Sequence, residues 1–519
     1  MKATRGVVAA GHKVTAQAAA EILDAGGNAY DAALAALFAS CVAEPVLASL
    51  GGGGFLLAGC SDGSSTLYDF FSQTPMHKCD PVGADFYPIV ADFGTTQQEF
   101  HIGMGSIATP GVVRGLFTIH RELCRLPMRT IVQPACDAAR SGVVINPLQR
   151  YISELVAPIL KSTPQAMALH ATSEHPDRFA ECGEQLYQRD MADCFELLAV
   201  EGEDIFYRGE MGSALIESCQ QLGGFLTERD LLEYRVEKRR PLALGYHHAQ
   251  LLTNPAPSVG GTLIAFTLAL LEAEKLGREQ PGGYMHLLKI ARAQQLTQQL
   301  RNEKAIDRNL SSATSRELLS DSYLEIYRKV LARHTSCYRG TTQISVADHS
   351  GNMASMTLSN GEGSGYVLPG TGIMLNNMLG EEDINPHGFH QWPENRRIAS
   401  MMAPTLLFSD SGQAIATGSG GSNRIRSAIL QVLVNLVDFR MDIERAVEFP
   451  RLHFEGETLN LEHKLSAEEH KILSASFSDI KLWPQKNLFF GGAHTVTRSE
   501  NGALSGEGDS RRGGVCIEV

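Results

Sequence analysis

The segment that most constrains the fold lies well past the middle of this 519-residue chain. Residues 342–348 alternate between two faces, with Thr342, Ile344 and Val346 sharing one of them, and residues 353–358 repeat the pattern after a short turn. A period of two on both sides of a turn that contains glycine and asparagine is typical of an antiparallel hairpin. The sequence therefore predicts a β-hairpin at this point of the fold.

Thr341 stands at the leading edge of this hairpin and directly follows Gly340. An internal threonine is a poor nucleophile. A threonine at a chain N-terminus carries its own general base, because the α-amine titrates at about 7.7 to 8.0 and lies within reach of the hydroxyl. Cleavage of the peptide bond before Thr341 would create that arrangement. The same residues also fit an ordinary strand that begins after a glycine.

Composition and charge exclude several classes of protein. Hydrophobic residues make up 43% of the chain and charged residues 20%, which is typical of a globular enzyme with a large buried core. A formal net charge of -13 argues against a nucleic-acid partner, because phosphate binding needs concentrated lysine and arginine. The short basic run at residues 237–240 is expected to be a solvated turn.

Neither a membrane span nor a metal centre is expected from the sequence. The longest apolar stretch, residues 32–47, is interrupted by Ser40, Glu44 and Pro45, and the first residues lack the apolar core of a signal peptide. We therefore expect a cytoplasmic protein. The ten cysteines are scattered without close pairs, which argues against a CxxC redox site and a zinc site.

The order of the patterns along the chain predicts one continuous core with helices between two groups of strands. Helical periodicity appears at residues 14–25, 32–41, 128–160, 191–221 and 261–276. Further strands are expected at residues 55–57, 66–71, 403–408, 414–417 and 493–498, with 513–519 closing the chain. This order predicts a layered structure in which a mainly antiparallel double sheet is faced by helices and the nucleophile lies between the sheets.

Three later segments are rich in glycine or hydroxyl groups: residues 363–365, 400–404 and 418–424. A threonine that cleaves amides needs donors aimed at the oxygen of the tetrahedral intermediate, and the unhindered N–H groups of a tight glycine turn can supply them. Residues 418–424 also fit a simpler role, a strand-to-helix turn capped by Ser422 that leads into residues 425–437.

In this order, the segments resemble the γ-glutamyltranspeptidase family of N-terminal-nucleophile hydrolases over nearly the whole chain. The segments that carry the likeness are residues 49–55, 68–70, 109–112, 206–210, 223–227, 230–231 with 234, 257–261, 341–342, 370–377, 403–405 and 490–494. The resemblance implies an α+β fold, a four-layer αββα sandwich, made as a proenzyme that cuts itself before Thr341. Residues 1–340 would form a large subunit and residues 341–519 a small catalytic subunit, intertwined as one domain.

The resemblance also implies the chemistry and the partners. Thr341 would attack an amide carbonyl to form an acyl-enzyme, and water or an amine would resolve it without a metal or an organic cofactor. The partners would be a small amide or γ-glutamyl substrate and the chain's own two fragments, with a homodimer as one option for assembly.

Site residues carry over from the family position by position. Thr357 and Ser359 match a second hydroxyl near the nucleophile, although both also fit ordinary strand positions. The oxyanion donors fall at Gly420 and Gly421, where the family's preceding proline is absent, whereas an ungapped alignment selects Gly421 and Ser422. The expected substrate-binding residues are Phe71, Asn377, Glu381, Ser400, Met401 and Ser422.

Departures from the family pattern concern the substrate. Phe71 occupies the position of an arginine that grips the substrate α-carboxylate in glutamyl-specific members, and Met401 replaces a common second serine. Glu381 falls near the acidic residue that holds the substrate α-amine. If the substrate is not glutamyl, Arg397 or Arg424 would supply a cation instead.

Three functions therefore remain open. The first is a γ-glutamyltransferase-like enzyme with glutathione as its default donor. The second, favoured by Phe71, is an amidohydrolase or acylase that acts on another small amide, such as oxamate. The third is a non-catalytic binding protein that keeps the fold and never matures, which the Gly340–Thr341 junction and the glycine turn argue against.

Overall fold

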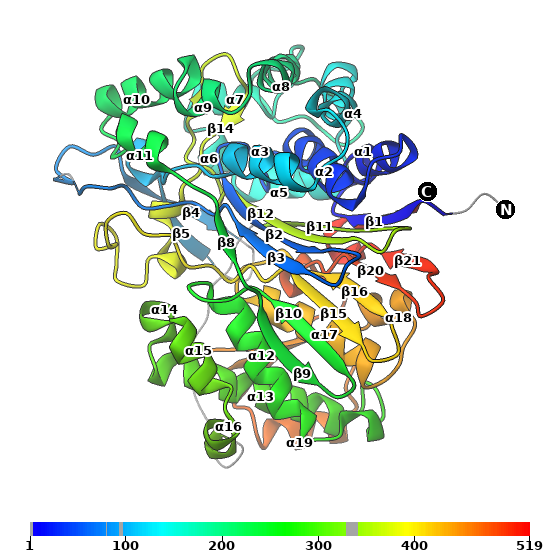
Figure 1. The fold of residues 1–519 in the computed structure, drawn as a ribbon. Coiled ribbons are helices and arrows are strands. Elements are labelled where there is room, and N and C mark those ends of the chain that lie inside the picture. Colours follow the sequence, from blue (N-terminus) through cyan, green and yellow to red (C-terminus); the bar gives the residue numbers. More distant parts are fainter. Residues whose placement is uncertain (1–3, 79, 93–96, 328–340) are drawn as a thin grey trace.

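The computed structural model describes residues 4–78, 80–92, 97–327 and 341–519, and its centre is a seven-stranded antiparallel sheet (Figure 1). Its strands, in spatial order, are β22 (Val515–Glu518), β1 (Gly6–Ala10), β11 (Thr342–Asp348), β12 (Met353–Ser359), β2 (Gly53–Gly59), β3 (Ser65–Asp69) and β8 (Glu237–Arg239). The hairpin β11–β12 is the predicted one. It lies between β1 and β2, so segments from both sides of Thr341 alternate within one sheet.

A second antiparallel sheet of six strands packs against the first. Its spatial order is β21 (Leu504–Glu507), β20 (Thr495–Arg498), β16 (Ala414–Thr417), β15 (Thr405–Ser409), β10 (Ala249–Thr253) and β9 (Leu242–Tyr246). Three small two-stranded sheets pair β4 (Tyr87–Asp92) with β5 (Gln97–Ile102), β6 (Val143–Val144) with β7 (Gln185–Leu186), and β13 (Val367–Leu368) with β14 (Ile373–Met374). A three-stranded sheet has the order β17 (Leu452–Glu455), β18 (Thr458–Leu461) and β19 (Asp479–Leu482).

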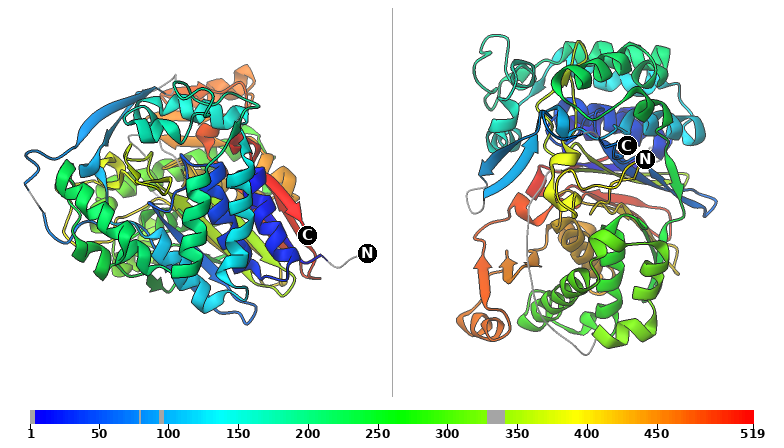
Figure 2. Two further views of the ribbon diagram at one scale, coloured as in Figure 1. Left: turned by 90° about the horizontal axis from the view of Figure 1, so that it is seen from above. Right: turned by 90° about the vertical axis from the view of Figure 1, so that its left-hand side faces the viewer.

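Helices cover the outer faces of both large sheets (Figures 1 and 2). On the side of the first sheet lie α1 (Lys13–Asp24), α2 (Ala29–Ala43), α3 (Val112–Leu123) and α4 (Met128–Ser141), and on the side of the second lie α12 (Val259–Glu272), α13 (Tyr284–Glu303) and α17 (Arg424–Val437). The remaining helices are α5 (Pro147–Leu155), α6 (Ala157–Leu160), α7 (Pro164–Ala168), α8 (Arg189–Glu201), α9 (Asp204–Tyr207), α10 (Glu210–Leu222), α11 (Glu228–Glu233), α14 (Ile306–Asn309), α15 (Ser312–Leu318), α16 (Asp321–Tyr327), α18 (Ile443–Glu448) and α19 (Ala467–Ser474).

The strand alternation explains how one sheet serves two hydrophobic cores. In β1, Val8 and Ala10 belong to the core beneath α1 and α2, whereas Val7 and Ala9 belong to the core shared with the second sheet. Because successive side chains point to opposite faces, a strand buried on both sides is apolar throughout. The small side chains of α2, all of them buried, let this helix pack closely on the sheet.

The mixed helix-and-sheet architecture confirms the coarse prediction, but one local prediction was wrong. Residues 237–240 are not a free turn, because Glu237–Arg239 forms the edge strand β8. The guanidinium of Arg239 lies 2.8 Å from the buried carboxylate of Asp69, and this ion pair ties the edge strand to β3. Among the described residues, the helices are all too short or too polar to cross a bilayer.

Candidate active site

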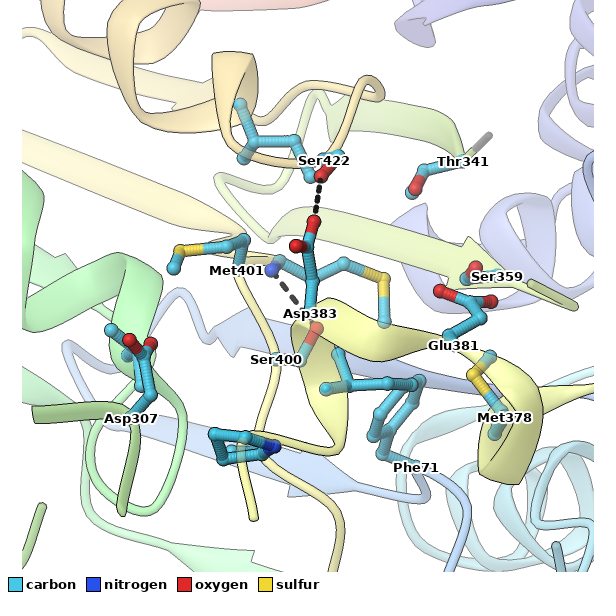
Figure 3. A pocket seen from close by; sticks show the side chains of 16 residues that line it. Phe71, Asp307, Thr341, Ser359, Met378, Glu381, Asp383, Ser400, Met401 and Ser422 are labelled. Carbon is cyan, nitrogen blue, oxygen red and sulfur yellow. Dashed lines mark hydrogen bonds between the residues drawn. The ribbon is translucent and has the colours of Figure 1, made fainter. Parts of the chain in front are cut away.

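A pocket lies at the end of the first sheet, where Thr341 immediately precedes β11 (Figure 3). Its lining combines hydroxyls, three carboxylates and apolar side chains. Seven of the residues predicted from the sequence line it: Phe71, Thr341, Ser359, Glu381, Ser400, Met401 and Ser422. The fold therefore brings predicted residues that are more than 300 positions apart in the sequence into one pocket.

The register of the hairpin places Thr341 beside Ser359. The printed pairs begin with Thr342 opposite Leu358 and continue with Gln343 opposite Thr357, so Thr341 and Ser359 are the next pair outward. Thr341 also shares a face with Gln343, which lies against Gly418 at the end of the second sheet. Thr341 thus lies at the end of the interface between the two sheets. It is buried, with 4% of its surface exposed.

The same register separates Thr357 from the pocket. Thr357 lies two pairs further inside the sheet than Ser359, and its hydroxyl donates a 2.6 Å hydrogen bond to Oε1 of Gln343. Of the two predicted residues Thr357 and Ser359, Ser359 lines the pocket, whereas Thr357 bonds to Gln343.

The main chain of Thr341 is held by two segments outside the strands, the turn after β16 and the connection between β21 and β22. Nη1 of Arg512 donates a 3.2 Å hydrogen bond to the Thr341 carbonyl oxygen. Gly420 packs against the same oxygen so closely that an added Cβ would lie 2.0 Å from it. Glycine is needed here because of this close approach. The absence of a side chain at Gly420 is therefore part of what positions Thr341.

Gly420→Ala is expected to displace Thr341 and to lower activity at least about tenfold, together with a loss of about 1–3 kcal/mol in unfolding free energy from overpacking. The measurements are the rate of amide cleavage and the free energy of unfolding in urea. Gly245→Ala is the matched control, because an added Cβ at Gly245 meets nothing within 4 Å. Normal activity of Gly420→Ala would show that this contact does not position Thr341.

The Arg512 side chain passes close to two glycines on its way to Thr341, and larger residues there would block it. Added Cβ atoms would lie 2.7 Å from the Arg512 side chain at Gly492 and 3.1 Å from Nη2 at Gly421. Burial, with the nearby Arg424, lowers the pKa of Arg512 to about 10, so the guanidinium still carries its charge at neutral pH. A buried positive charge thus lies beside the backbone of Thr341.

A network of buried ion pairs supports the segment that carries Arg512. Asp509 lies 2.6 Å from Arg451 and 3.2 Å from Arg511, and Arg511 also lies 2.6 Å from Glu462. Burial alone would raise the pKa of Asp509, but Arg451 and Arg511 outweigh it and hold the pKa well below its usual range. The charged carboxylate also accepts a 2.8 Å hydrogen bond from the Ala493 N–H.

The turn after Gly420 presents two backbone donors near Thr341. Gly421 has a φ of +118° and Ser422 a φ of +51°, and both values lie in the region that favours glycine. In the part of the chain that the structure describes, neither N–H donates a hydrogen bond to the protein. Ser422 lines the pocket, and its hydroxyl lies 3.3 Å from Oδ2 of Asp383, the dashed contact in Figure 3.

Acidic side chains surround the rest of the pocket. Glu381 is buried, and its Oε1 lies against Gly361, where an added Cβ would be 2.2 Å away. Asn377 does not line the pocket but approaches the same glycine, and its Oδ1 accepts a 2.9 Å hydrogen bond from the Glu362 N–H. The third lining carboxylate besides Glu381 and Asp383 belongs to Asp307.

Phe71 forms an apolar wall in the position where an arginine was expected from the family pattern. It is 2% exposed and stacks on Phe55 at a centroid distance of 5.4 Å. The described lining of the pocket contains no lysine or arginine. A substrate carboxylate in this pocket would therefore lack the bidentate partner that an arginine supplies.

The prediction that Arg397 or Arg424 supplies a cation to this pocket was wrong. Arg397 donates to the carbonyl of Phe71 and the hydroxyl of Tyr234 and lies 3.5 Å from Asp69, on the far side of the Phe71 backbone. Arg424 is buried and donates a 3.2 Å hydrogen bond to the Phe489 carbonyl. Neither side chain is among the described lining residues.

Ser400 and Met401 are fixed by the start of α12. The Ser400 carbonyl accepts hydrogen bonds from the Val259 N–H at 2.9 Å and from the Ser258 hydroxyl at 3.2 Å. Gly260 packs on the Met401 carbonyl, where an added Cβ would lie only 2.0 Å away. Glycine at position 260 therefore lets the backbone of Met401 pack directly against the start of α12.

Arg512 and the lining residues Asp307 and Asp383 were not predicted from the sequence. Glu44, which bonds to Thr342, was not predicted either. Glu44 accepts a 2.8 Å hydrogen bond from the Thr342 hydroxyl, and burial raises its pKa against that hydrogen bond. The arginine pair at residues 511–512, directly followed by two glycines, was the signal in the sequence for Arg512. Within the described residues, no group of three or more His, Cys, Asp and Glu side chains could hold a metal ion.

Known proteins match this chain along nearly its full length. The family described as "Gamma-glutamyltranspeptidase" matches residues 15–519. The "Acylase ACY 1 proenzyme" of Pseudomonas sp. (strain V22) is 30% identical over 534 residues, which cover 99% of this chain and 94% of that protein. The "Glutathione hydrolase proenzyme" of Escherichia coli (strain K12) is 28% identical over 550 residues, which cover 98% and 91%. A cephalosporin acylase from Bacillus halodurans has a similar fold, with a TM-score of 0.85, 23% identity, and coverage of 99% of this chain and 96% of that one.

Proposed function

The chain belongs to the γ-glutamyltranspeptidase family, and on that premise we propose that Thr341 becomes an N-terminal nucleophile that cleaves a small amide through an acyl-enzyme. The observation that carries the proposal is the position of Thr341, buried just before β11 and lining a pocket together with Ser359 and Ser422. The two relatives above are both named proenzymes, which supports maturation by self-cleavage. Gly340, on the other side of the proposed cut, lies outside the described residues.

In the proposed mechanism, the freed α-amine of Thr341 takes the hydroxyl proton while the oxygen attacks the amide carbonyl. The amine then gives the proton to the leaving nitrogen, and water or an acceptor amine releases the acyl group in a second cycle. The buried charge of Arg512 would disfavour protonation of the amine and so increase the fraction present as free base. Ser359 would hold the threonine hydroxyl or the attacking water.

The oxyanion donors are best assigned to the Gly421 and Ser422 N–H groups. Both belong to the turn beside Thr341, and neither is used in a hydrogen bond within the described protein. Donors that are fixed in place before the reaction stabilise the developing charge without reorganisation. Gly420 would then serve by its close approach to Thr341 instead of as a donor.

The architecture supports a finer assignment of the fold and of its maturation. We assign the two facing sheets and their outer helices to a four-layer αββα sandwich. Residues 1–340 and 341–519 would remain together after cleavage, because β11 and β12 lie between β1 and β2. Fragments that share one sheet cannot separate without breaking its hydrogen bonds.

The pocket favours an acylase-like substrate over a γ-glutamyl one. Its wall at Phe71 is apolar, its described lining holds no cation, and three carboxylates surround it. Glu381 and Asp383 fit a substrate amine or hydrogen-bond donors, whereas an α-carboxylate would be repelled and unpaired. A γ-glutamyl donor remains the second candidate, supported by Glu381 at the position where the family holds the α-amine.

Phe71→Arg is expected to raise kcat/KM for a γ-glutamyl anilide about tenfold or more, because it restores a bidentate carboxylate partner. Phe71→Leu is the control, since it removes the ring without adding charge. The measurement is release of the aniline from γ-glutamyl and simple acyl anilides by each variant. If wild type already prefers the γ-glutamyl substrate, or if Phe71→Arg gives no gain over Phe71→Leu, the acylase-like assignment is wrong.

A further inference from the structure

A second hollow adjoins the pocket that contains Thr341. The two share four lining residues, Asp307, Ile384, Pro386 and Ala399, so they lie side by side. We call this second hollow the annex.

The charges of the annex are opposite to those of the pocket. Arginines at 308, 396 and 397 line it, whereas the pocket's described lining has carboxylates and no basic residue. The one carboxylate at the boundary, Asp307, is already paired, because both of its oxygens lie within 3.1 Å of Nε of Arg301. Arg397 is likewise committed to Asp69, Tyr234 and the Phe71 carbonyl.

Arg308 and Arg396, which are both exposed, are the two remaining arginines that line the annex. Nε of Arg308 donates a 3.0 Å hydrogen bond to the carbonyl of Pro386, a residue that lines both hollows, and this bond anchors the guanidinium at their boundary. The backbone of Arg396 is fixed by Thr74, which accepts from its N–H and donates to its carbonyl, both at 2.9 Å. Neither arginine forms an ion pair with an acidic residue in the described part of the chain.

We infer that the annex is an anion subsite, and that Arg308 and Arg396 select amides whose far end carries a carboxylate. The reacting amide and its uncharged or amine-bearing part would occupy the pocket, and the carboxylate would reach past Pro386 to the arginines. Two guanidinium groups with free donors are suited to a carboxylate, which they can bind in bidentate fashion. This inference rests on the proposed amide cleavage at Thr341 and adds the substrate class.

Two substrate series locate the carboxylate. In the acyl series, anilides of dicarboxylic acids of increasing length are compared with their ω-carboxamides. In the amine series, one simple acyl group is attached to amino acids and to the corresponding amino acid amides. We expect kcat/KM to be about tenfold higher for the charged member in one series, chiefly through KM, with a preference that falls as salt rises.

Arg308→Gln and Arg396→Gln are each expected to reduce this preference severalfold, and the double variant to abolish it. Arg278→Gln, an exposed arginine in another hollow, should keep it. A charged-to-neutral ratio near one in both series, or a ratio that survives the double substitution, would overturn the inference while amide cleavage continues.

A binding measurement separates this inference from the proposed chemistry. Calorimetric titration of the wild-type protein with a dicarboxylate and with its monoamide requires no turnover. We expect the dicarboxylate to bind about tenfold more tightly, and the double arginine variant to lose the difference. Equal binding of the two compounds would contradict the annex as an anion subsite, whereas tighter binding without any amide cleavage would contradict only the role of Thr341.

Discussion

Thr341→Ala is expected to leave the chain uncut and to lower amide hydrolysis by roughly 1,000-fold or more, because the variant lacks both the nucleophile and the hydroxyl that would attack the preceding peptide bond. The loss should appear in kcat, with little change in folding, since the exchange removes a small side chain that is partly open to the pocket. Denaturing electrophoresis and the rate of anilide cleavage measure the two effects.

Two variants control for the position of the change. Thr341→Ser keeps a hydroxyl and should retain cleavage and a reduced rate. Thr342→Val removes a hydroxyl one residue later that points to the other face of the sheet, where it donates to Glu44 at 2.8 Å. This variant should still mature, although it leaves a buried carboxylate with one hydrogen bond fewer. Substantial turnover by Thr341→Ala would rule out Thr341 as the nucleophile.

Arg512→Met is expected to lower kcat about 10- to 100-fold, because it removes a charged hydrogen bond that positions the Thr341 carbonyl. It should also move the acidic limb of the pH profile to higher pH. The positive charge of Arg512 disfavours the ammonium form of the Thr341 amine, so without it that form persists to a higher pH. The measurement is kcat/KM against pH.

Two further variants separate this effect from a loss of stability. Arg512→Lys keeps a charge near the amine and should recover much of the normal acidic limb. Arg426→Met removes another buried arginine, one that bonds to Gln298 at 2.7 Å, and should lower thermal stability without moving the limb. If the acidic limb of the kcat/KM profile of Arg512→Met lies at the same pH as in the wild type, Arg512 does not influence the Thr341 amine.

The hairpin and the nucleophile could be predicted because their signals are local. The alternation at residues 342–358 fixes both strands, and β11 and β12 match it to within one residue. The register was harder to predict. Thr357 and Ser359 share a face, and only the pairing with β11 shows that Ser359 lies next to Thr341 while Thr357 bonds to Gln343.

The residues that sequence reasoning missed act through contacts distant along the chain. Arg512 approaches Thr341 only because β22 and β20 return the end of the chain to the central sheets, and the spacing of residues 341 and 512 does not encode that return. Arg397 shows the opposite error. It lies close in sequence to pocket residues, but its guanidinium is held behind Phe71 by Asp69 and Tyr234. The presence of a charged residue at position 397 did not indicate whether its guanidinium would line the pocket.

The most direct test of the account is the N-terminal sequence and intact mass of active wild-type protein. The account predicts two fragments that stay together under native conditions, with the smaller one beginning Thr-Thr-Gln-Ile-Ser at Thr341. Full amide-cleaving activity in material that consists only of the uncut 519-residue chain would contradict it.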